Sequence, residues 1–315
     1  MKTNNARILV IGAGVNGSIC AVGLQKAGVD VRVLARGKRC EDIREKGIII
    51  EDVLQNTRSV TKVPVIDFLN PEDLYDYILV VVRKNQVSDL LPILACNRTP
   101  NIVFMVNNPS GPDEWIQALG KERVLMGFVF GAGRREGNVI RGMSTVNYFA
   151  GRLWPTPFGE VDGSITPRLK RLVEILRSAG FPVLVSTRIS DYLATHAALV
   201  AVLGVFIMKR GYDRESLARY STADFYLLVD AMRDALDVLY VNKIHITPAN
   251  TAVVKYIPRR ILTSAIRAAL PSRFMEVGGL YHLSQAPDEI MQLAEEFKIL
   301  VEKSNLPVPA IRKVL

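Results

Sequence analysis

Three glycines near the start of the chain give the clearest chemical signal in the sequence. Residues 12–17, GAGVNG, match the pattern G-x-G-x-x-G. In this pattern the first glycine allows a tight turn, the second lets the backbone approach a pyrophosphate, and the third lets a helix pack close to a strand. The backbone N–H groups at the start of that helix face the anion. The residues expected to bind a dinucleotide are Gly12, Gly14, Val15, Asn16 and Gly17.

The elements on either side of this motif decide whether it indicates a dinucleotide site or an ordinary glycine-rich turn. Residues 7–11, RILVI, form a β-branched run that stops at the first glycine, as a buried parallel strand does. A helical pattern follows over about 15–27, and VRVLA at 31–35 is a second strand. The motif therefore joins a strand to a helix, which is the context that supports dinucleotide binding rather than an ordinary glycine-rich turn.

The end of the second strand distinguishes between the two nicotinamide dinucleotides. An NAD site normally has Asp or Glu there, about 20 residues after the motif, to bind the ribose 2′-hydroxyl. Here the sequence reads Ala35-Arg36-Gly37-Lys38-Arg39, with no acid before Glu41. Because a guanidinium can grip a phosphate bidentately, Arg36 favours NADP (as NADPH) over NADH. The alternative is that Arg36 only opens a basic surface loop.

The first part of the chain continues to alternate between strands and helices. Further buried strands are expected at 77–82 and 101–106, and a helix followed by a strand at 164–187, with Thr166 as N-cap and Pro167 at the first helical position. Residues 124–130 and shorter β-like pieces around 139–160 either extend the sheet or cover an edge. The series predicts an α/β fold with a Rossmann-type, doubly wound parallel sheet.

From about residue 188 the pattern becomes helical. Helices are expected over 191–209, 223–243, 250–270 and 285–304. We therefore predict two domains, an NADP-binding Rossmann domain at 1–186 and an all-helical substrate and dimerisation domain at 187–315. The long apolar helices suit either a homodimer contact or a single core, and the sequence leaves both open.

The composition and net charge of the chain indicate which partners and which location to expect. The 315 residues carry a formal net charge of +9, but the basic residues are scattered and no nucleic-acid motif accompanies them, so we expect no nucleic-acid partner. The longest apolar run, 197–208, spans about 18 Å as a helix, too short for a bilayer, and predicts a core helix and no membrane partner. The N-terminus lacks a signal-peptide pattern, and three scattered cysteines suit the reducing cytoplasm.

Several segments, in this order, resemble the ketopantoate reductase (2-dehydropantoate 2-reductase) family. They are RILVIGAGVNGSICAVGLQKAG with VRVLARG, then VVRKNQVSD, VNNPSG, GEVDG with SAGFPVLVSTRISDYLATHAAL, and finally PDEIMQLAEEF with LPVPAI. The first segment is shared by many Rossmann proteins, whereas the rest together are more specific. The resemblance implies NADPH-dependent reduction of a small-molecule 2-oxo acid, as from ketopantoate to pantoate. It also implies an active site in the cleft between a Rossmann domain and a helical domain.

The resemblance assigns further residues to the site. The family's cofactor asparagine falls on Asn107, followed here by Asn108 rather than glycine. A family lysine near the cofactor falls on Arg83, beside Lys84. The family's substrate-binding glutamate falls on Glu289. Each has a simpler interpretation too, since asparagine suits turns and an acidic residue suits the first turn of any helix.

One expected group is missing from the helix at 191–209. In the family this helix carries a catalytic lysine that stabilises and protonates the developing alkoxide, with asparagines four and eight residues later. The resemblance puts Ala194 at the lysine and Ala198 and Val202 at the asparagines, and sliding the alignment by one or two residues restores neither type. The chain is therefore a divergent member whose proton donor has to be another group.

Candidate replacements are His196 and His282, the second paired with Glu289; Tyr281, Arg83 and Lys84 are further options that the sequence does not separate. The leading hypothesis is an active reductase with a changed substrate. The second is a catalytically idle NADP(H)-binding sensor or assembly protein. The third is a hydroxyacid or opine-type dehydrogenase, which needs a catalytic histidine and has only His196, His245 and His282 to supply it.

Overall fold

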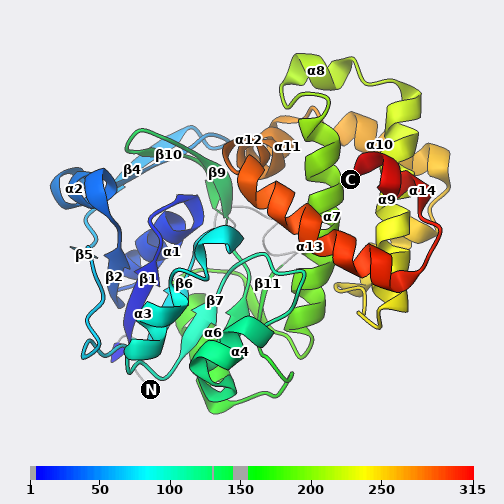
Figure 1. The fold of residues 1–315 in the computed structure, drawn as a ribbon. Helices are drawn as coiled ribbons and strands as arrows, with labels where there is room; N and C mark the ends of the chain where they lie inside the picture. The colour runs from blue at the N-terminus through cyan, green and yellow to red at the C-terminus, as the bar shows by residue number, and fades with distance from the viewer. Residues whose placement is uncertain (1–4, 130, 145–154) are drawn as a thin grey trace. The chain divides into compact units, whose positions relative to one another are not determined.

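The computed structural model describes residues 5–129, 131–144 and 155–315 (Figure 1). The chain divides into two compact units. The first contains residues up to Val106 together with Pro112–Ile189, and the second contains Asn107–Gly111 together with Ser190–Leu315. The assignment of nucleotide binding to the first unit, and of substrate binding and dimerisation to the second, stays a prediction.

The first unit is built on an eight-stranded sheet with the order β12-β11-β8-β7-β6-β1-β2-β5. Its strands are β1 (Arg7–Ile11), β2 (Asp30–Leu34), β5 (Val65–Ile66), β6 (Tyr77–Val80), β7 (Ile102–Phe104), β8 (Val124–Gly127), β11 (Thr156–Glu160) and β12 (Val183–Val185). All neighbours pair in parallel except β11 and β8. The chain passes from β1 outward to β5 and then returns to β6 on the other side, so the doubly wound prediction is confirmed.

Helices cover this sheet, and a stacked aromatic pair marks its core. The helices are α1 (Val15–Lys26), α2 (Gly37–Lys46), α3 (Leu91–Cys96), α4 (Asp113–Leu119) and α6 (Pro167–Ser178). Trp115 stacks on Phe104 with ring centroids 4.2 Å apart. The predicted cap of α6 is confirmed, because the Thr166 hydroxyl accepts a hydrogen bond from the Leu169 N–H at 3.2 Å.

A second sheet, which the sequence did not predict, lies in the same unit. Its order is β4-β3-β10-β9, formed by β3 (Ile48–Asp52), β4 (Thr57–Thr61), β9 (Gly131–Glu136) and β10 (Val139–Ser144). The pieces expected around 139–160 are thus split, with β10 here and β11 in the main sheet. Helix α1 contacts strands of both sheets and lies between them (Figure 1). This sandwich holds the start of α1 against the start of β9.

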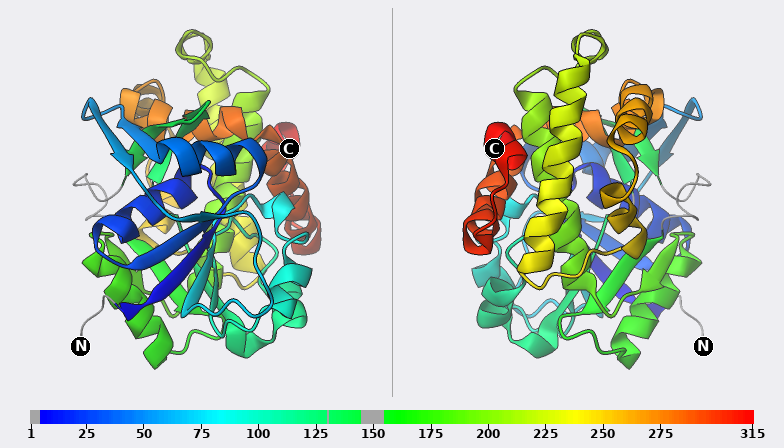
Figure 2. Two further views of the ribbon diagram at one scale, coloured as in Figure 1. Left: turned by 90° about the vertical axis from the view of Figure 1, so that its left-hand side faces the viewer. Right: turned by 90° about the vertical axis from the view of Figure 1, so that its right-hand side faces the viewer.

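The second unit is helical, as predicted. Its helices are α7 (Ile189–Met208), α8 (Arg214–Ala218), α9 (Thr222–Val241), α10 (Arg259–Ala269), α11 (Arg273–Met275), α12 (Tyr281–Gln285), α13 (Pro287–Ser304) and α14 (Pro309–Val314) (Figures 1 and 2). The single helix expected at 250–270 is wrong, because a 3₁₀ segment at Ala249–Lys255 precedes α10. Pro258, which caps α10, divides the two, as proline ends a helix that would otherwise run through it.

Helix α7 is longer than the apolar run considered in the sequence. Among the described residues it is one helix that is long and apolar enough to cross a membrane, judged by length and composition alone. The expectation that the apolar segment is too short to cross a bilayer is therefore wrong, because α7 has 20 residues rather than the 12 of the run at 197–208. Of its most apolar stretch, 61% is buried within the protein. The ring of Phe206 meets that of Tyr220 edge-on at 5.6 Å, which is the packing of a core helix.

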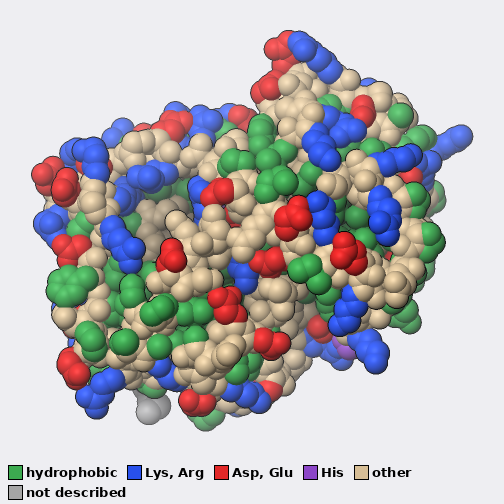
Figure 3. All heavy atoms as spheres, in the orientation of Figure 1, with side chains coloured by type: hydrophobic (Ala, Val, Ile, Leu, Met, Phe, Trp, Pro, Cys, Tyr) green, Lys and Arg blue, Asp and Glu red, His purple; other side chains and the backbone are tan. Residues whose placement is uncertain are grey.

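On the face drawn in Figure 3, basic side chains alternate with acidic ones rather than forming one continuous basic area. Many of the described arginines and lysines pair with nearby carboxylates, for example Arg98 with Glu72 at 3.0 Å. Interspersed charges of this kind are typical of a solvated surface.

Candidate active site

The glycine turn joins β1 to α1, and two of its glycines are required by the fold itself. Gly12 has φ +106°, and a Cβ there would lie 2.2 Å from the Val81 carbonyl oxygen. A Cβ on Gly17 would lie 1.8 Å from the Gly12 carbonyl oxygen. These approaches set the tight turn and the close packing of helix on strand.

Gly14 differs from the other two glycines. It is exposed, its φ is −73°, and a Cβ there would meet nothing within 4 Å. It also stands at the N-cap of α1, where no side chain caps the helix and no acidic residue occupies the first turn. The space in front of the turn is therefore open, and the N–H groups at the start of α1 face no capping carboxylate or hydroxyl.

Val15 and Asn16 begin α1, and both are half-buried. The Asn16 side chain has a structural contact, because its Oδ1 accepts a hydrogen bond from the Gly131 N–H of β9 at 3.0 Å. The expected role of these two residues in cofactor binding stays a prediction.

Arg36 follows β2 and is exposed at the N-cap of α2. No acidic residue lies in the first turn of this helix. Three residues later, Arg39 reaches back to the glycine turn, where its Nε donates to the Ala13 carbonyl at 3.1 Å. Burial lowers the Arg39 pKa to about 10, with the nearby Arg135 charge adding to the effect. Sequence reasoning included Arg39 in a basic run but gave it no role.

Arg83 and Lys84 lie after the end of β6, in the same unit as the glycine turn. The Arg83 N–H donates to Gln86 Oε1 at 3.2 Å. Lys84 is buried to 6% exposure, with its Nζ 5.4 Å from the centre of the Trp115 ring. A buried cation at the carboxyl end of a parallel strand is well placed for an anionic ligand.

Three residues predicted for the site meet inside the second unit. The Asn107 amide donates to Glu289 Oε1 at 3.4 Å, and His282 Nε2 lies 3.5 Å from Glu289 Oε2. Glu289 occupies the first turn of α13 and is only 3% exposed. Asn107 Oδ1 is buried and has no hydrogen-bond partner in the part of the chain that the structure describes. A buried amide oxygen of this kind is available to a ligand that can donate a hydrogen bond.

The local backbone explains how His282 reaches Glu289. Helix α12 follows a π-helical turn at Glu276–Leu280, and a single residue, Ala286, separates α12 from the start of α13 at Pro287. Pro287 at the start of α13 ends the preceding segment. Such π-helical turns are frequent at functional sites, because they redirect side chains that follow them.

His196 lies on α7 and is close to His282. Burial, with a smaller contribution from the charge of His282, lowers the pKa of His196 to about 4. The Tyr192 ring, one turn earlier, lies parallel to the His196 ring with centroids 6.4 Å apart. At neutral pH His196 is therefore an uncharged imidazole. Of the other candidate proton donors, Tyr281 is buried, with 8% of its surface exposed.

The face of α7 that includes Ala194, Ala198 and Val202 is buried, with exposures of 6%, 0% and 0%. Thr195, also buried, accepts a hydrogen bond from the Thr247 N–H at 3.2 Å. Its hydroxyl is thus part of the packing of the second unit.

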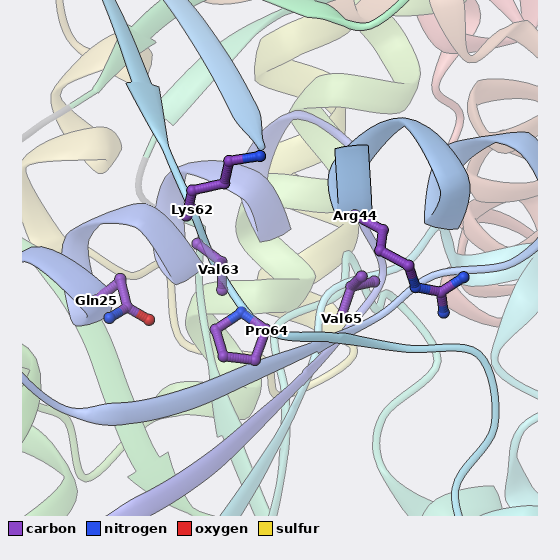
Figure 4. A pocket seen from close by; sticks show the side chains of 6 residues that line it. All are labelled: Gln25, Arg44, Lys62, Val63, Pro64 and Val65. Atoms are coloured by element: carbon purple, nitrogen blue, oxygen red, sulfur yellow. The ribbon is translucent and has the colours of Figure 1, made fainter. Parts of the chain in front are cut away.

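A hollow in the first unit is not a good candidate site. It has a volume of about 430 Å³ and is lined by Gln25, Arg44, Lys62, Val63, Pro64 and Val65 (Figure 4). The polar ends of Gln25, Arg44 and Lys62 point in different directions. Gln25 lies in the last turns of α1, about 15 Å along the helix from Val15, so the hollow is remote from the glycine turn.

Comparison with known proteins shows which proteins these residues resemble. Residues 8–152 match the family model of ketopantoate reductase PanE/ApbA. Over these residues, slightly less than half of the chain, the protein is similar to ketopantoate reductases. The match includes the glycine turn, Arg36, Arg83, Lys84 and Asn107.

Individual ketopantoate reductases and their structural relatives extend the comparison. A 2-dehydropantoate 2-reductase from Archaeoglobus fulgidus is 31% identical over 176 residues, which cover 55% of this chain and 54% of the relative. The alignment thus spans about half the length of that relative.

Solved structures cover almost the whole chain. The 2-dehydropantoate 2-reductase of Geobacter metallireducens superposes with a TM-score of 0.72 at 18% identity, covering 98% of this chain and 97% of that one. A complex of D-mandelate dehydrogenase with NADH gives 0.71 at 15% identity, covering 98% and 96%. At these identities the superpositions establish the shared fold, a Rossmann-type domain followed by helices.

Proposed function

We propose that the protein is an NADPH-dependent reductase that converts a small 2-oxo acid to the 2-hydroxy acid, with a substrate other than ketopantoate. The proposal depends on one observation, which is that the side chains of Asn107, His282 and Glu289 form a polar group of residues in the second unit. Reduction of a ketone needs a group that stabilises and protonates the developing alkoxide. This group offers an imidazole, a buried carboxylate and an amide for that purpose.

The first unit fits the cofactor. The open space at Gly14 and the uncapped start of α1 suit a pyrophosphate, and Arg36 in place of an acid suits a 2′-phosphate. Arg83 and Lys84 add positive charge after β6. When bound, NADPH would supply the two electrons that the keto carbon receives.

His282 is our choice of proton donor. A protonated His282 would be paired with the Glu289 carboxylate, so Glu289 would hold the ring in place and stabilise its charge. His196 suits this role less, because a pKa of about 4 leaves almost none of it protonated at pH 7. We assign His196 to the wall of the substrate site, beside Tyr192. Asn107 positions the carboxylate and offers its buried oxygen to a ligand.

The substrate is expected to differ from that of typical family members. By the resemblance, Ala194, Ala198 and Val202 stand where the family has a lysine and two asparagines. None of the three can form a side-chain hydrogen bond to a substrate, and all are buried. The groups that hold the substrate must therefore come from elsewhere, which favours a 2-oxo acid with an apolar substituent.

The proposal is tested by following NADPH oxidation at 340 nm with a panel of 2-oxo acids. Wild-type protein is expected to turn over at least one of them. Replacing His282 by glutamine should lower kcat by roughly 10²–10⁴ while leaving the Kd for NADPH unchanged. His245→Gln is the matched control, because His245 is largely exposed and pairs with Asp191 at 3.2 Å rather than with Glu289.

Two outcomes would contradict the proposal. Tight NADPH binding without oxidation by any member of the panel would favour the idle NADP(H)-binding protein. Full activity in His282→Gln together with loss in His196→Gln would move the proton donor to α7, as the hydroxyacid or opine-type reading requires. The expected partner is a small molecule; a homodimer and a cytoplasmic location stay predictions from the sequence.

A further inference from the structure

Arg39 makes more hydrogen bonds than an exposed arginine in the first turn of a helix usually does. Its Nε donates to the Ala13 carbonyl at 3.1 Å, and its Nη2 donates to Ser18 Oγ at 3.1 Å. Its Nη1 donates to the Asn138 carbonyl at 3.2 Å and to Asn138 Oδ1 at 2.6 Å. Ser18 is fully buried and itself donates to the Ala13 carbonyl at 3.2 Å. The guanidinium is therefore fixed against the middle of the glycine turn.

Every hydrogen-bond partner of this guanidinium among the described residues is neutral. Within the ranges that the structure describes, no carboxylate lies within ion-pair distance of Arg39, although burial already disfavours its charge. Four of its five N–H groups donate to the acceptors above, which leaves one on Nη2. The charge of Asp42 favours the guanidinium, but burial and the charge of Arg135 disfavour it more strongly. A half-buried cation that is only partly compensated is costly, and an anionic ligand would offset that cost.

The surroundings of Arg39 favour an anion as well. Arg36, Lys38 and Arg39 occupy the N-cap and first turn of α2, where the helix dipole is positive and acidic residues are usual. The chain has none there. Arg135 of β9 adds a further positive charge close to Arg39. These groups surround the end of β2, which is where a Rossmann site holds the adenosine ribose.

We propose that Arg39 is a specificity-determining residue that binds the 2′-phosphate of NADPH together with Arg36, and that Asn138 holds it in position for this. The inference rests on the proposed function only in its choice of cofactor. The remaining Nη2 N–H and the partly compensated charge would meet a phosphate oxygen, while the four existing hydrogen bonds keep the side chain from moving away. A guanidinium already ordered in the free protein loses little entropy on binding.

Asn138 links Arg39 to the second sheet. It lies in the turn between β9 and β10 and accepts twice from Arg39, so the four-stranded sheet supports the nucleotide site through one side chain. Asn138 would act through Arg39 rather than touch the cofactor. We therefore expect Asn138→Ala to weaken NADPH binding less than Arg39→Gln does.

The test measures Kd for NADPH, NADH and adenosine 2′,5′-bisphosphate by calorimetry on the full-length protein. Arg39→Gln should weaken NADPH and the bisphosphate by roughly tenfold to a hundredfold, and NADH by less than about threefold. Arg39→Lys should recover part of the loss, because it restores the charge without the fork. Arg98→Gln, an exposed arginine paired with Glu72, removes the same charge at a distance and should change none of the three.

Equal losses for NADPH and NADH would overturn the proposal, because they would mean that Arg39 only supports the glycine turn. Wild-type protein that binds NADPH no better than NADH would overturn it too. Absence of turnover with every 2-oxo acid would contradict the proposed function but not this inference, since binding alone is measured here. A melting temperature recorded for each variant separates lost binding from lost folding.

Discussion

Gly14→Ala tests the phosphate-binding turn without disturbing the fold that carries it. The residue has φ −73°, which alanine adopts freely, and the added Cβ would meet nothing within 4 Å. Replacing glycine at a compatible position gains about 0.4–1 kcal/mol through the unfolded chain. Alanine is a poorer N-cap than glycine by a similar amount, about 0.5–1 kcal/mol. The free energy of unfolding should therefore stay within about 1 kcal/mol of wild type.

The effect on nucleotide binding should be much larger. The new methyl group would project into the open space in front of α1, where the pyrophosphate is expected. Displacing the phosphate from even one backbone N–H removes a charge-assisted hydrogen bond, worth about 1.5–3 kcal/mol. This corresponds to a Kd for NADPH raised roughly tenfold to a hundredfold, since each 1.4 kcal/mol is a factor of ten.

The assay pairs calorimetric titration of NADPH with urea unfolding of the free protein. Gly17→Ala is the matched control, because its Cβ would lie 1.8 Å from the Gly12 carbonyl oxygen. That variant should lose about 1–3 kcal/mol or more of stability, as overpacked cores do. If Gly14→Ala bound NADPH as tightly as wild type, the glycine turn would not be the phosphate site and the reasoning would be refuted.

Three further substitutions test other parts of the structure. Because the folded-state pKa of His196 is lowered to about 4 from 6.5, the unfolded chain binds more protons between these values, so stability should fall as pH drops from 6.5 to 4, by at most about 3 kcal/mol. In His196→Gln that part of the pH dependence of urea unfolding should disappear, and an unchanged profile would contradict the burial of the ring. Ala198→Asn should lower the free energy of unfolding by about 2 kcal/mol or more, because it buries an amide in the core. The control Ala268→Asn, on the exposed side of α10, should be nearly neutral. Equal melting temperatures of the two variants would show that the α7 face is not core. Thr166→Ala should cost about 1 kcal/mol by removing the cap of α6, and Thr166→Ser should restore most of it, with denaturant titration as the measurement.

The sequence predicted the parts of the fold that depend on local pattern. The strand at β1, the glycine turn and α1 follow from a β-branched run that stops at glycine, and the cap at Thr166 follows from a threonine directly before proline. These features are set by residues close together in the chain. The same holds for the helical second unit, because apolar spacing of three and four residues defines α9 and α13.

What the sequence did not predict depends on contacts between distant residues. The second sheet pairs β3 with β10, whose residues lie about 90 positions apart, and neither segment shows strong alternation. Arg39 looked like one of several surface cations until its contact with Asn138, 99 residues later, fixed its place. The basic composition of Arg36 to Arg39 was a usable signal, but it did not indicate which side chain turns inward.

The residues around the candidate proton donor likewise divide into contacts between nearby residues and contacts between distant ones. The pairing of His282 with Glu289 was open to prediction, because seven residues separate them around a short turn. The approach of Asn107 to Glu289 spans 182 residues, and only the resemblance to a family suggested that both belong to one site. The low pKa of His196 depends on how α7 is buried, which no local pattern reveals.

The central claim, reduction of a 2-oxo acid, is tested most directly by isotope transfer. The protein is incubated with NADPH carrying deuterium at both C4 positions and with the panel of 2-oxo acids, and the products are examined by NMR. Our account predicts deuterium at C2 of a single enantiomer of a 2-hydroxy acid, with transfer strongly slowed in His282→Gln. Bound NADPH that retains its deuterium against every acid in the panel would contradict it.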